Sequence, residues 1–198
     1  QLAMTTDIAS GVEAEECRFV LSPKETIYIN RDEVRFTSGS HHFLLYLTPY
    51  EAVPTESLKG KPVDTSEVFD CSDGPTADWQ VTKLIGGSQN ATGDSAIRFP
   101  SNVGMKIPAN SVLLMNAHYI NTSAEVLATE VRVNLHTIPE AEVESEGDVL
   151  FWYNMFIHVP GQSEARARMR CTIQQDITIS NVQSHMHARG VGYAAALM

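Results

Sequence analysis

Short apolar runs separated by glycine, proline, asparagine and serine recur along the chain, and this punctuation limits what it can fold into. Such runs are typical of antiparallel β-strands joined by turns, and no long amphipathic helix interrupts them. The sequence therefore predicts an all-β chain, built as an antiparallel β-sandwich. We expect strands at residues 17–21, 26–29, 43–47, 80–85, 111–120, 131–137, 149–159, 167–179 and 192–197.

An acidic segment at residues 139–148 separates the last three expected strands from the others. With 198 residues, of which 43% are hydrophobic, the chain can bury a sizeable core and form one or two domains. Because the acidic segment has no face to bury, we place a boundary there, with one domain at 1–138 and a second at 149–198. An ordinary solvated loop would have the same composition.

The net charge of −10 bears on the partners of the chain. A nucleic-acid-binding surface needs positive charge for the phosphates, and no local basic patch is visible, so we expect no nucleic-acid partner. No apolar run approaches the roughly 18 residues that a membrane helix needs, and we expect no membrane span.

Five of the seven histidines lie in three places: His41-His42, His118, and His185-Met186-His187. Side chains alternate along a strand, so His185 and His187 project from one face and can meet one ion. Neutral imidazole is the commonest metal ligand near neutral pH. Two solvated or buried histidines without a metal would explain that pair alone equally well.

His41 and His42 are neighbours, and neighbours on a regular strand face opposite ways. Both can reach one ion only if the backbone bends there, and the nearby Gly39 permits a bend. His118 lies in a second apolar run, where a single histidine more often has a structural role. Of the remaining two histidines, His136 and His158, neither matches a ligand motif.

The residues around the histidines limit which metal ion such a site could bind. The three places contain no cysteine and no His-x-Asp or His-x-Glu pair, which argues against a cysteine-rich zinc site, a blue-copper site and the usual iron facial triad. Copper or catalytic zinc in an all-histidine site remains. An Asp or Glu from elsewhere in the chain could still complete an iron site.

The three places, in this order, resemble motifs of the copper type II, ascorbate-dependent monooxygenases, the family of peptidylglycine α-hydroxylating monooxygenase and dopamine β-monooxygenase. The family's His-His pair before an apolar strand resembles residues 40–46, SHHFLLY. Its single histidine followed by tyrosine resembles 117–119, AHY, and its later His-x-His resembles 184–187, SHMH. The resemblance spans residues 17–197.

This resemblance implies two jelly-roll β-sandwich domains that each hold one copper. His41, His42 and His118 would be ligands of an electron-transfer copper, and His185 and His187 would be ligands of the catalytic copper that binds dioxygen. Ascorbate would supply the electrons. The implied reaction hydroxylates an unactivated C–H bond of a small-molecule substrate, with the metal supplying the chemistry.

The chain departs from the family pattern in its second half. The family's methionine ligand lies well downstream of the His-x-His motif, whereas only 11 residues follow His187 here, and we leave that ligand unassigned. The second domain therefore looks truncated. Peptide-hydroxylating members have an arginine two residues before the motif, where this chain has Gln183. Gln183 resembles the amine-hydroxylating branch, and we expect it to bind substrate.

The cysteines bear on the compartment. Cys17 and Cys71 resemble a family disulfide of the first domain, while Cys171 resembles a family cysteine whose partner is absent from this chain. A disulfide beside copper and dioxygen implies an oxidising compartment, so we expect a secreted or, in a bacterium, periplasmic protein. Three reduced cytosolic thiols are the alternative.

Two other functions fit the same residues. A copper-binding or copper-delivery protein would keep the first site without hydroxylating a substrate, and the missing methionine favours it. A hydrolase with a histidine-rich zinc site on a related double sandwich is the other alternative.

Overall fold

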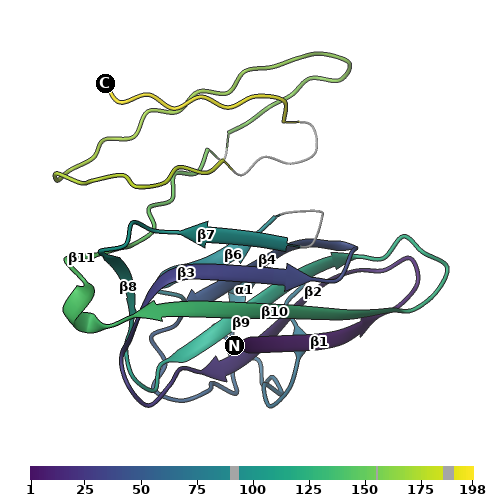
Figure 1. Cartoon of the computed structure of the whole chain (residues 1–198). Helices are drawn as coiled ribbons and strands as arrows, with labels where there is room; N and C mark the ends of the chain where they lie inside the picture. Colours follow the sequence, from purple (N-terminus) through teal and green to yellow (C-terminus); the bar gives the residue numbers. More distant parts are fainter. Residues whose placement is uncertain (90–93, 155, 185–189) are drawn as a thin grey trace. The chain divides into compact units, whose positions relative to one another are not determined.

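The computed structural model describes residues 1–89, 94–154, 156–184 and 190–198 (Figure 1). It contains two compact units, Gln1–Leu150 and Phe151–Met198. The strands of the described chain all lie in the first unit, where they form two sheets, so the predicted all-β class is confirmed. Among the described residues, no helix is both long and apolar enough to cross a membrane.

The first sheet has six strands and is antiparallel except at its end. In spatial order it contains β1 (Leu2–Ile8), β10 (Leu127–Ile138), β3 (Ile27–Phe36), β8 (Val103–Ile107) and β11 (Ser145–Glu146), and β7 (Asp94–Arg98) pairs with the second half of β3. The two-residue strand β11 runs parallel to β8.

The second sheet carries the histidines. In spatial order it contains β5 (Phe69–Asp70), β2 (Glu13–Leu21), β9 (Val112–Ile120), β4 (Ser40–Leu47) and β6 (Lys83–Ser88), and all neighbours are antiparallel. A short helix, α1 (Pro75–Asp78), lies in the connection from β5 to β6. The central position of β9 places His118 between β2 and β4.

The two sheets pack face to face through alternate residues of their strands. In β9 the inner residues are Leu113, Met115, Ala117 and Tyr119, and they share one core with residues of both sheets. Burial of each large apolar side chain in such a core contributes about 1.5–3 kcal/mol. The other core residues include Met4, Ile29, Val34, Phe36, Phe43, Leu45, Met105, Ile107, Val131 and Val133.

A second, smaller cluster lies on the outer face of the second sheet, around the disulfide between Cys17 and Cys71. Phe19 of β2 packs edge-to-face on Trp79, with ring centroids 5.1 Å apart. This cluster also contains Phe69, Val112 and Leu114. The connection between β4 and β6 therefore covers one end of this outer face, and the histidines of β4 and β9 lie toward the other end.

Six of the nine predicted strands are confirmed, because they overlap β2, β3, β4, β6, β9 and β10. Strands β1, β5, β7, β8 and β11 were not predicted. The predictions at 149–159, 167–179 and 192–197 are wrong, since the described residues of these segments form no strand. The apolar side chains of their described residues lie exposed, among them Phe156 with 94% of its surface accessible. A strand requires a pairing partner and a surface to bury, and the apolar pattern alone supplies neither.

The acidic segment at 139–148 lies within the first unit. It forms a 3-10 helix, η1 (Glu140–Glu142), and then β11. Several contacts hold it against the sheets, among them the hydrogen bond that the hydroxyl of Tyr28 donates to Glu140 Oε1 at 2.9 Å and the ion pair of Lys83 Nζ with Asp148 Oδ2 at 3.5 Å. The domain limits 1–138 and 149–198 stay a prediction.

Candidate metal centre

A β-bulge at His41 brings the neighbouring histidines of β4 to the same side. Ser40 lies opposite Tyr119 of β9, and His42 lies opposite His118, so His41 is an extra residue with no partner in the ladder. Such a residue bends the strand and redirects its side chains. Gly39, with φ of 100°, precedes the bulge in the turn from β3. The expected bend therefore exists, with the extra residue at His41 itself.

Three imidazole nitrogens converge at this bulge. The Nδ1 atom of His41 lies 3.1 Å from Nδ1 of His42 and 3.2 Å from Nδ1 of His118. The ligand atoms of all three residues lie within 4.8 Å of one another. Two nitrogens that bind one ion at 2.0–2.1 Å in tetrahedral geometry are separated by about 3.3–3.4 Å. The three side chains can therefore hold one metal ion with little movement.

Hydrogen bonds alone satisfy this arrangement poorly. A neutral imidazole has one N–H, and a ring nitrogen either donates that hydrogen or accepts through one lone pair. His41 Nδ1 has two nitrogen neighbours, so it can make one linear hydrogen bond at a time. A cation among the three rings would accept a lone pair from each of them, and the geometry thus fits a metal better than a hydrogen-bonded cluster.

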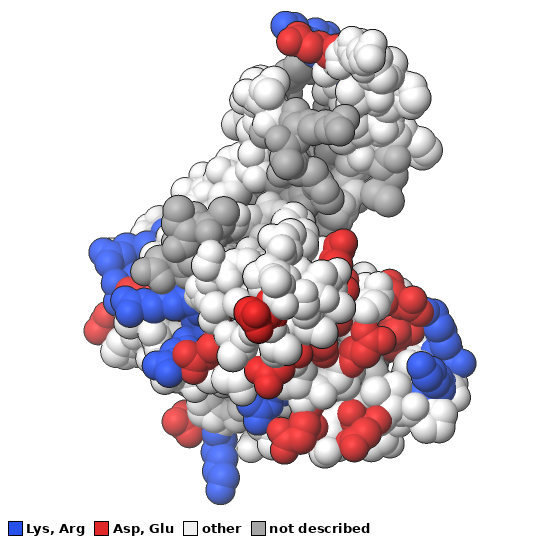
Figure 2. Space-filling model, turned by 90° about the vertical axis from the view of Figure 1, so that its right-hand side faces the viewer, with Lys and Arg blue, Asp and Glu red and all other residues white. Residues whose placement is uncertain are grey.

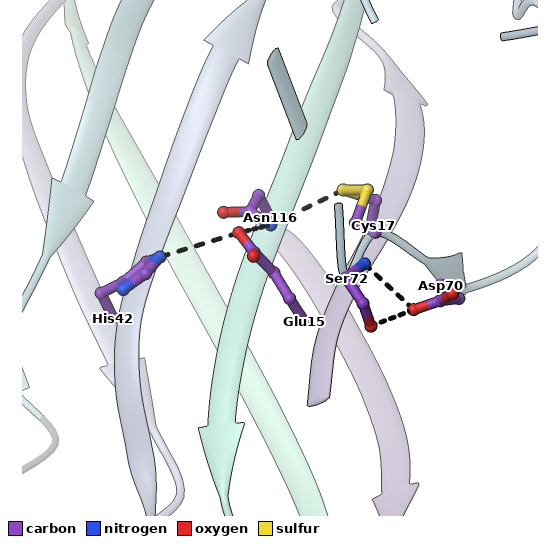
Figure 3. The surroundings of a disulfide bond; sticks show 7 residues. Glu15, Cys17, His42, Asp70, Ser72 and Asn116 are labelled. Atoms are coloured by element: carbon purple, nitrogen blue, oxygen red, sulfur yellow. Dashed lines mark hydrogen bonds and ion pairs between the residues drawn. A yellow bond between two sulfur atoms is a disulfide. The ribbon is translucent and has the colours of Figure 1, made fainter. Parts of the chain in front are cut away.

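Two carboxylates of β2 lie on the other side of the rings. Glu13 Oε1 is 2.9 Å from Nε2 of His118, and Glu15 Oε1 is 4.0 Å from Nε2 of His42. Asn116 holds Glu15 by donating from Nδ2 to the same oxygen at 3.1 Å (Figure 3). A carboxylate beside Nε2 favours a hydrogen on that nitrogen, which leaves Nδ1 with its lone pair.

The site lies at the surface but is largely covered. The side chains of His42 and His118 are 15% and 16% exposed. Acidic side chains are spread over the lower part of the face drawn in Figure 2, and basic side chains lie beside some of them. With the two carboxylates beside the rings, the local charge favours a cation.

The structure brings together three of the five predicted metal ligands: His41, His42 and His118. The other two, His185 and His187, lie outside the described residues. Gln183 is exposed in the second unit, and its role in substrate binding stays a prediction. Of the two unassigned histidines, His136 lies 3.3 Å from Glu33 on the first sheet, away from the cluster.

The disulfide prediction is confirmed, because Cys17 and Cys71 are bonded. Cys17 is on β2, and Cys71 follows β5, the neighbouring strand. Cys171 is free and exposed. The Nδ2 atom of Asn116 lies 3.6 Å from Cys17 Sγ, so one amide contacts both the disulfide and the carboxylate of Glu15.

Sequence reasoning missed Glu13, Glu15 and Asn116. Side chains at every second position share a face of a strand, so Glu13 and Glu15 share the face of Cys17, and Asn116 shares the face of His118. That alternation was visible in the sequence. The pairing of β2 beside β9, which brings the two faces together, was not.

Comparison with protein-family models and with curated proteins finds no match to this chain.

Proposed function

We propose that this chain is a copper protein and that His41, His42 and His118 are the ligands of its copper. The convergence of three Nδ1 atoms at the bulge is the observation that carries this proposal. The ligand set favours copper or zinc, because imidazole suits both ions and the cluster contains no thiolate. The ordered motifs of the sequence favour copper.

We further propose that this copper transfers electrons. Bound copper would supply a reversible one-electron change between Cu(I) and Cu(II), with ascorbate as the electron donor. The protein's own contribution is to hold three imidazoles in one geometry through the pairing of β4 with β9. The low exposure of His42 and His118 suits an ion that passes electrons rather than one that binds a substrate.

The remainder of the proposal follows from the sequence resemblance. The chain would act as a copper-dependent monooxygenase with jelly-roll domains, which hydroxylates an unactivated C–H bond of a small molecule with dioxygen. His185 and His187 would hold the catalytic copper, and Gln183 would contact the substrate. The disulfide between Cys17 and Cys71 is compatible with a secreted or periplasmic location.

A copper-binding or copper-delivery protein without turnover is the second candidate. One observation favours it: the three histidines and the two neighbouring carboxylates all belong to the first unit, Gln1–Leu150. Every residue assigned to this site therefore comes from the first unit.

The test is copper stoichiometry with an electron paramagnetic resonance spectrum. Wild-type protein and a His118→Ala variant would be loaded with Cu(II) and dialysed, with His136→Ala as the matched control. We expect a Cu(II) signal with nitrogen coupling in the wild type and in His136→Ala, and its loss from this site in His118→Ala. Retained zinc without a Cu(II) signal would refute the copper assignment.

A second measurement separates the two candidates. Oxygen uptake in the presence of ascorbate would be followed with and without small aromatic amines. Uptake that depends on the added amine supports the monooxygenase, whereas bound copper without such uptake for any amine tested supports the copper-binding protein.

A further inference from the structure

Two glutamates of β2 lie beside the Nε2 atoms of His118 and His42, on the side of the rings away from the converging Nδ1 atoms, and their surroundings differ. Glu13 is close to His118, with 2.9 Å between Oε1 and Nε2, but 65% of its side chain is exposed. Glu15 is further from His42, at 4.0 Å, but only 18% of its side chain is exposed.

We infer that Glu13 and Glu15 are positioning residues of the three-histidine site with different tasks: Glu13 orients the ring of His118, and Glu15 supplies negative charge that favours Cu(II) over Cu(I). This inference rests on the proposed function, since it requires that the three histidines bind copper.

The task of Glu13 follows from its short contact. An acceptor 2.9 Å from Nε2 fixes the hydrogen on that nitrogen and fixes the rotation of the ring, which directs Nδ1 toward His41. The charge of Glu13 itself is screened, because most of its side chain is in water. Any side chain that can accept a hydrogen bond at this place should therefore perform the same task.

The task of Glu15 follows from its burial and its anchor. At 4.0 Å from Nε2 the carboxylate is beyond ordinary hydrogen-bond distance, but it is little screened by water. Asn116 keeps it in place by donating from Nδ2, and Asn116 is itself fully buried (Figure 3). A fixed negative charge stabilises a doubly charged ion more than a singly charged one.

The strand pairing explains why both glutamates reach the site. Glu15 lies directly opposite His118 in the register of β2 with β9, and His118 lies opposite His42 in the register of β9 with β4. Glu15, His118 and His42 therefore form one row across three strands, and Glu13 lies two residues before Glu15, at the start of β2 and on the same face. The carboxylates are part of the sheet rather than of a mobile loop.

The experiment measures Cu(II) and Cu(I) dissociation constants of the full chain by competition with chelators. The variants are Glu13→Ala, Glu13→Gln and Glu15→Gln. Glu33→Gln is the matched control, because Glu33 also lies beside a histidine, His136, but on the other sheet. Thermal unfolding of each metal-free variant shows whether the fold is kept.

We expect Glu13→Ala to weaken the binding of both ions by about 10–100-fold, as is usual for partners of metal-bound histidine. Glu13→Gln should recover most of this loss, because an amide oxygen accepts the same hydrogen bond. Glu15→Gln should weaken Cu(II) binding more than Cu(I) binding, and Glu33→Gln should change neither.

Wild-type affinities in Glu13→Ala would overturn the task assigned to Glu13. An equal loss of affinity for Cu(II) and Cu(I) in Glu15→Gln, or no loss of either affinity, would overturn the task assigned to Glu15. Failure of the wild-type chain to bind copper would instead refute the proposed function, so the two failures are distinguishable.

Discussion

The Nδ1 atoms of His41 and His42 lie 3.1 Å apart although the two residues are neighbours on one strand. On a regular strand their side chains would lie on opposite faces of the sheet. The one-residue register shift between β4 and β9 removes this obstacle, because His41 is added to the ladder while His42 stays opposite His118. The convergence of the three histidines thus depends on a single extra residue.

Deletion of His41 tests this dependence. The deletion would restore a regular ladder in which Ser40 and His42 keep their partners on β9, so the core register of Phe43 and Leu45 is unchanged. We expect the deletion variant to fold and to be at least as stable as His41→Ala. Both variants lack the His41 ligand, but only His41→Ala keeps the bulge. Copper affinity should fall in both by more than the ~10–100-fold typical of outer-shell changes.

The comparison requires urea unfolding and copper competition on both variants. A deletion variant that is much less stable than His41→Ala would mean that the bulge serves the fold rather than the site. Copper affinity unchanged from wild type in either variant would remove His41 from the ligand set.

Gly39 has a left-handed backbone conformation directly before the bulge. Its φ of 100° is rarely adopted by other residues, and a Cβ there would lie 2.9 Å from Cδ2 of Leu127. We expect Gly39→Ala to lower the free energy of unfolding by about 1–3 kcal/mol and to weaken copper binding, because the strained turn must shift. Gly11→Ala is the control, since Gly11 has φ of 71° but open space around it.

Gly11→Ala should destabilise less than Gly39→Ala and leave copper binding unchanged. Equal losses of stability in the two variants, measured by urea unfolding, would show that backbone strain alone matters and that the contact with Leu127 does not. Copper competition on the same samples would separate an effect on the site from an effect on the fold.

The all-β class could be predicted because it follows from local pattern, whereas the grouping of His118 with His41 and His42 was predicted only through the resemblance of the ordered motifs to a known family. Continuous apolar runs bounded by turn residues mark β4 and β9, and His41, His42 and His118 lie in or beside these runs. The sequence showed that the backbone must bend for His41 and His42 to reach one ion. It did not show where the bulge lies, since this depends on how β4 pairs with β9. Glu13 and Glu15 were missed for the same reason: their strand joins the site through tertiary pairing.

The wrong strand predictions have a different cause. Residues 149–159 and 192–197 contain apolar runs as good as that of β4, but apolar side chains such as Leu197, 81% exposed, find no core among the described residues of their unit. The unpredicted strand β7 shows the converse. Asp94–Arg98 is short and mostly polar, and it forms a strand because β3 offers a free edge. In both cases the availability of a pairing partner determines whether a segment forms a strand. The local sequence pattern does not show which segments will find such a partner.

The disulfide between Cys17 and Cys71 should contribute about 4 kcal/mol to stability, because it closes a loop with a sequence separation of 54. The double variant Cys17→Ala/Cys71→Ala should lose this amount in urea unfolding. Cys171→Ala is the control, since this thiol is free and exposed, and it should stay within about 0.5 kcal/mol of wild type. A loss below about 1 kcal/mol in the double variant would mean that the loop is already ordered in the unfolded chain.

Asp32 of β3 gives the fold a pH dependence. Burial raises the pKa of its carboxyl from 3.8 to about 6, although the backbone N–H of Ile97 donates to Oδ1 at 3.0 Å and opposes the rise. Its Oδ2 atom is buried and has no hydrogen-bond partner in the described part of the chain. The folded protein therefore holds a proton that the unfolded chain releases between about pH 4 and about pH 6.

The sign of the effect follows from this proton. Stability should fall as the pH rises from about 4 to about 6 and should then level off, because the folded state binds more protons than the unfolded state in this range. Asp32→Asn keeps the acceptor for Ile97 and cannot ionise, so its unfolding free energy should exceed that of wild type by about 1–2 kcal/mol at pH 8 and lose this pH dependence.

Urea unfolding between about pH 4 and about pH 8 checks the prediction for Asp32, and measurements below about pH 4 cover the range in which the effect of Asp64 is lost. Asp64→Asn is the contrasting variant, because the hydroxyl of Ser66 lowers the pKa of the exposed Asp64 carboxyl. Asp64 should therefore stabilise the fold above its ordinary pKa and lose this effect on acidification, opposite in sign to Asp32. A difference between wild type and Asp32→Asn that stays constant with pH would show that Asp32 is charged throughout the range, held by a partner other than the backbone of Ile97.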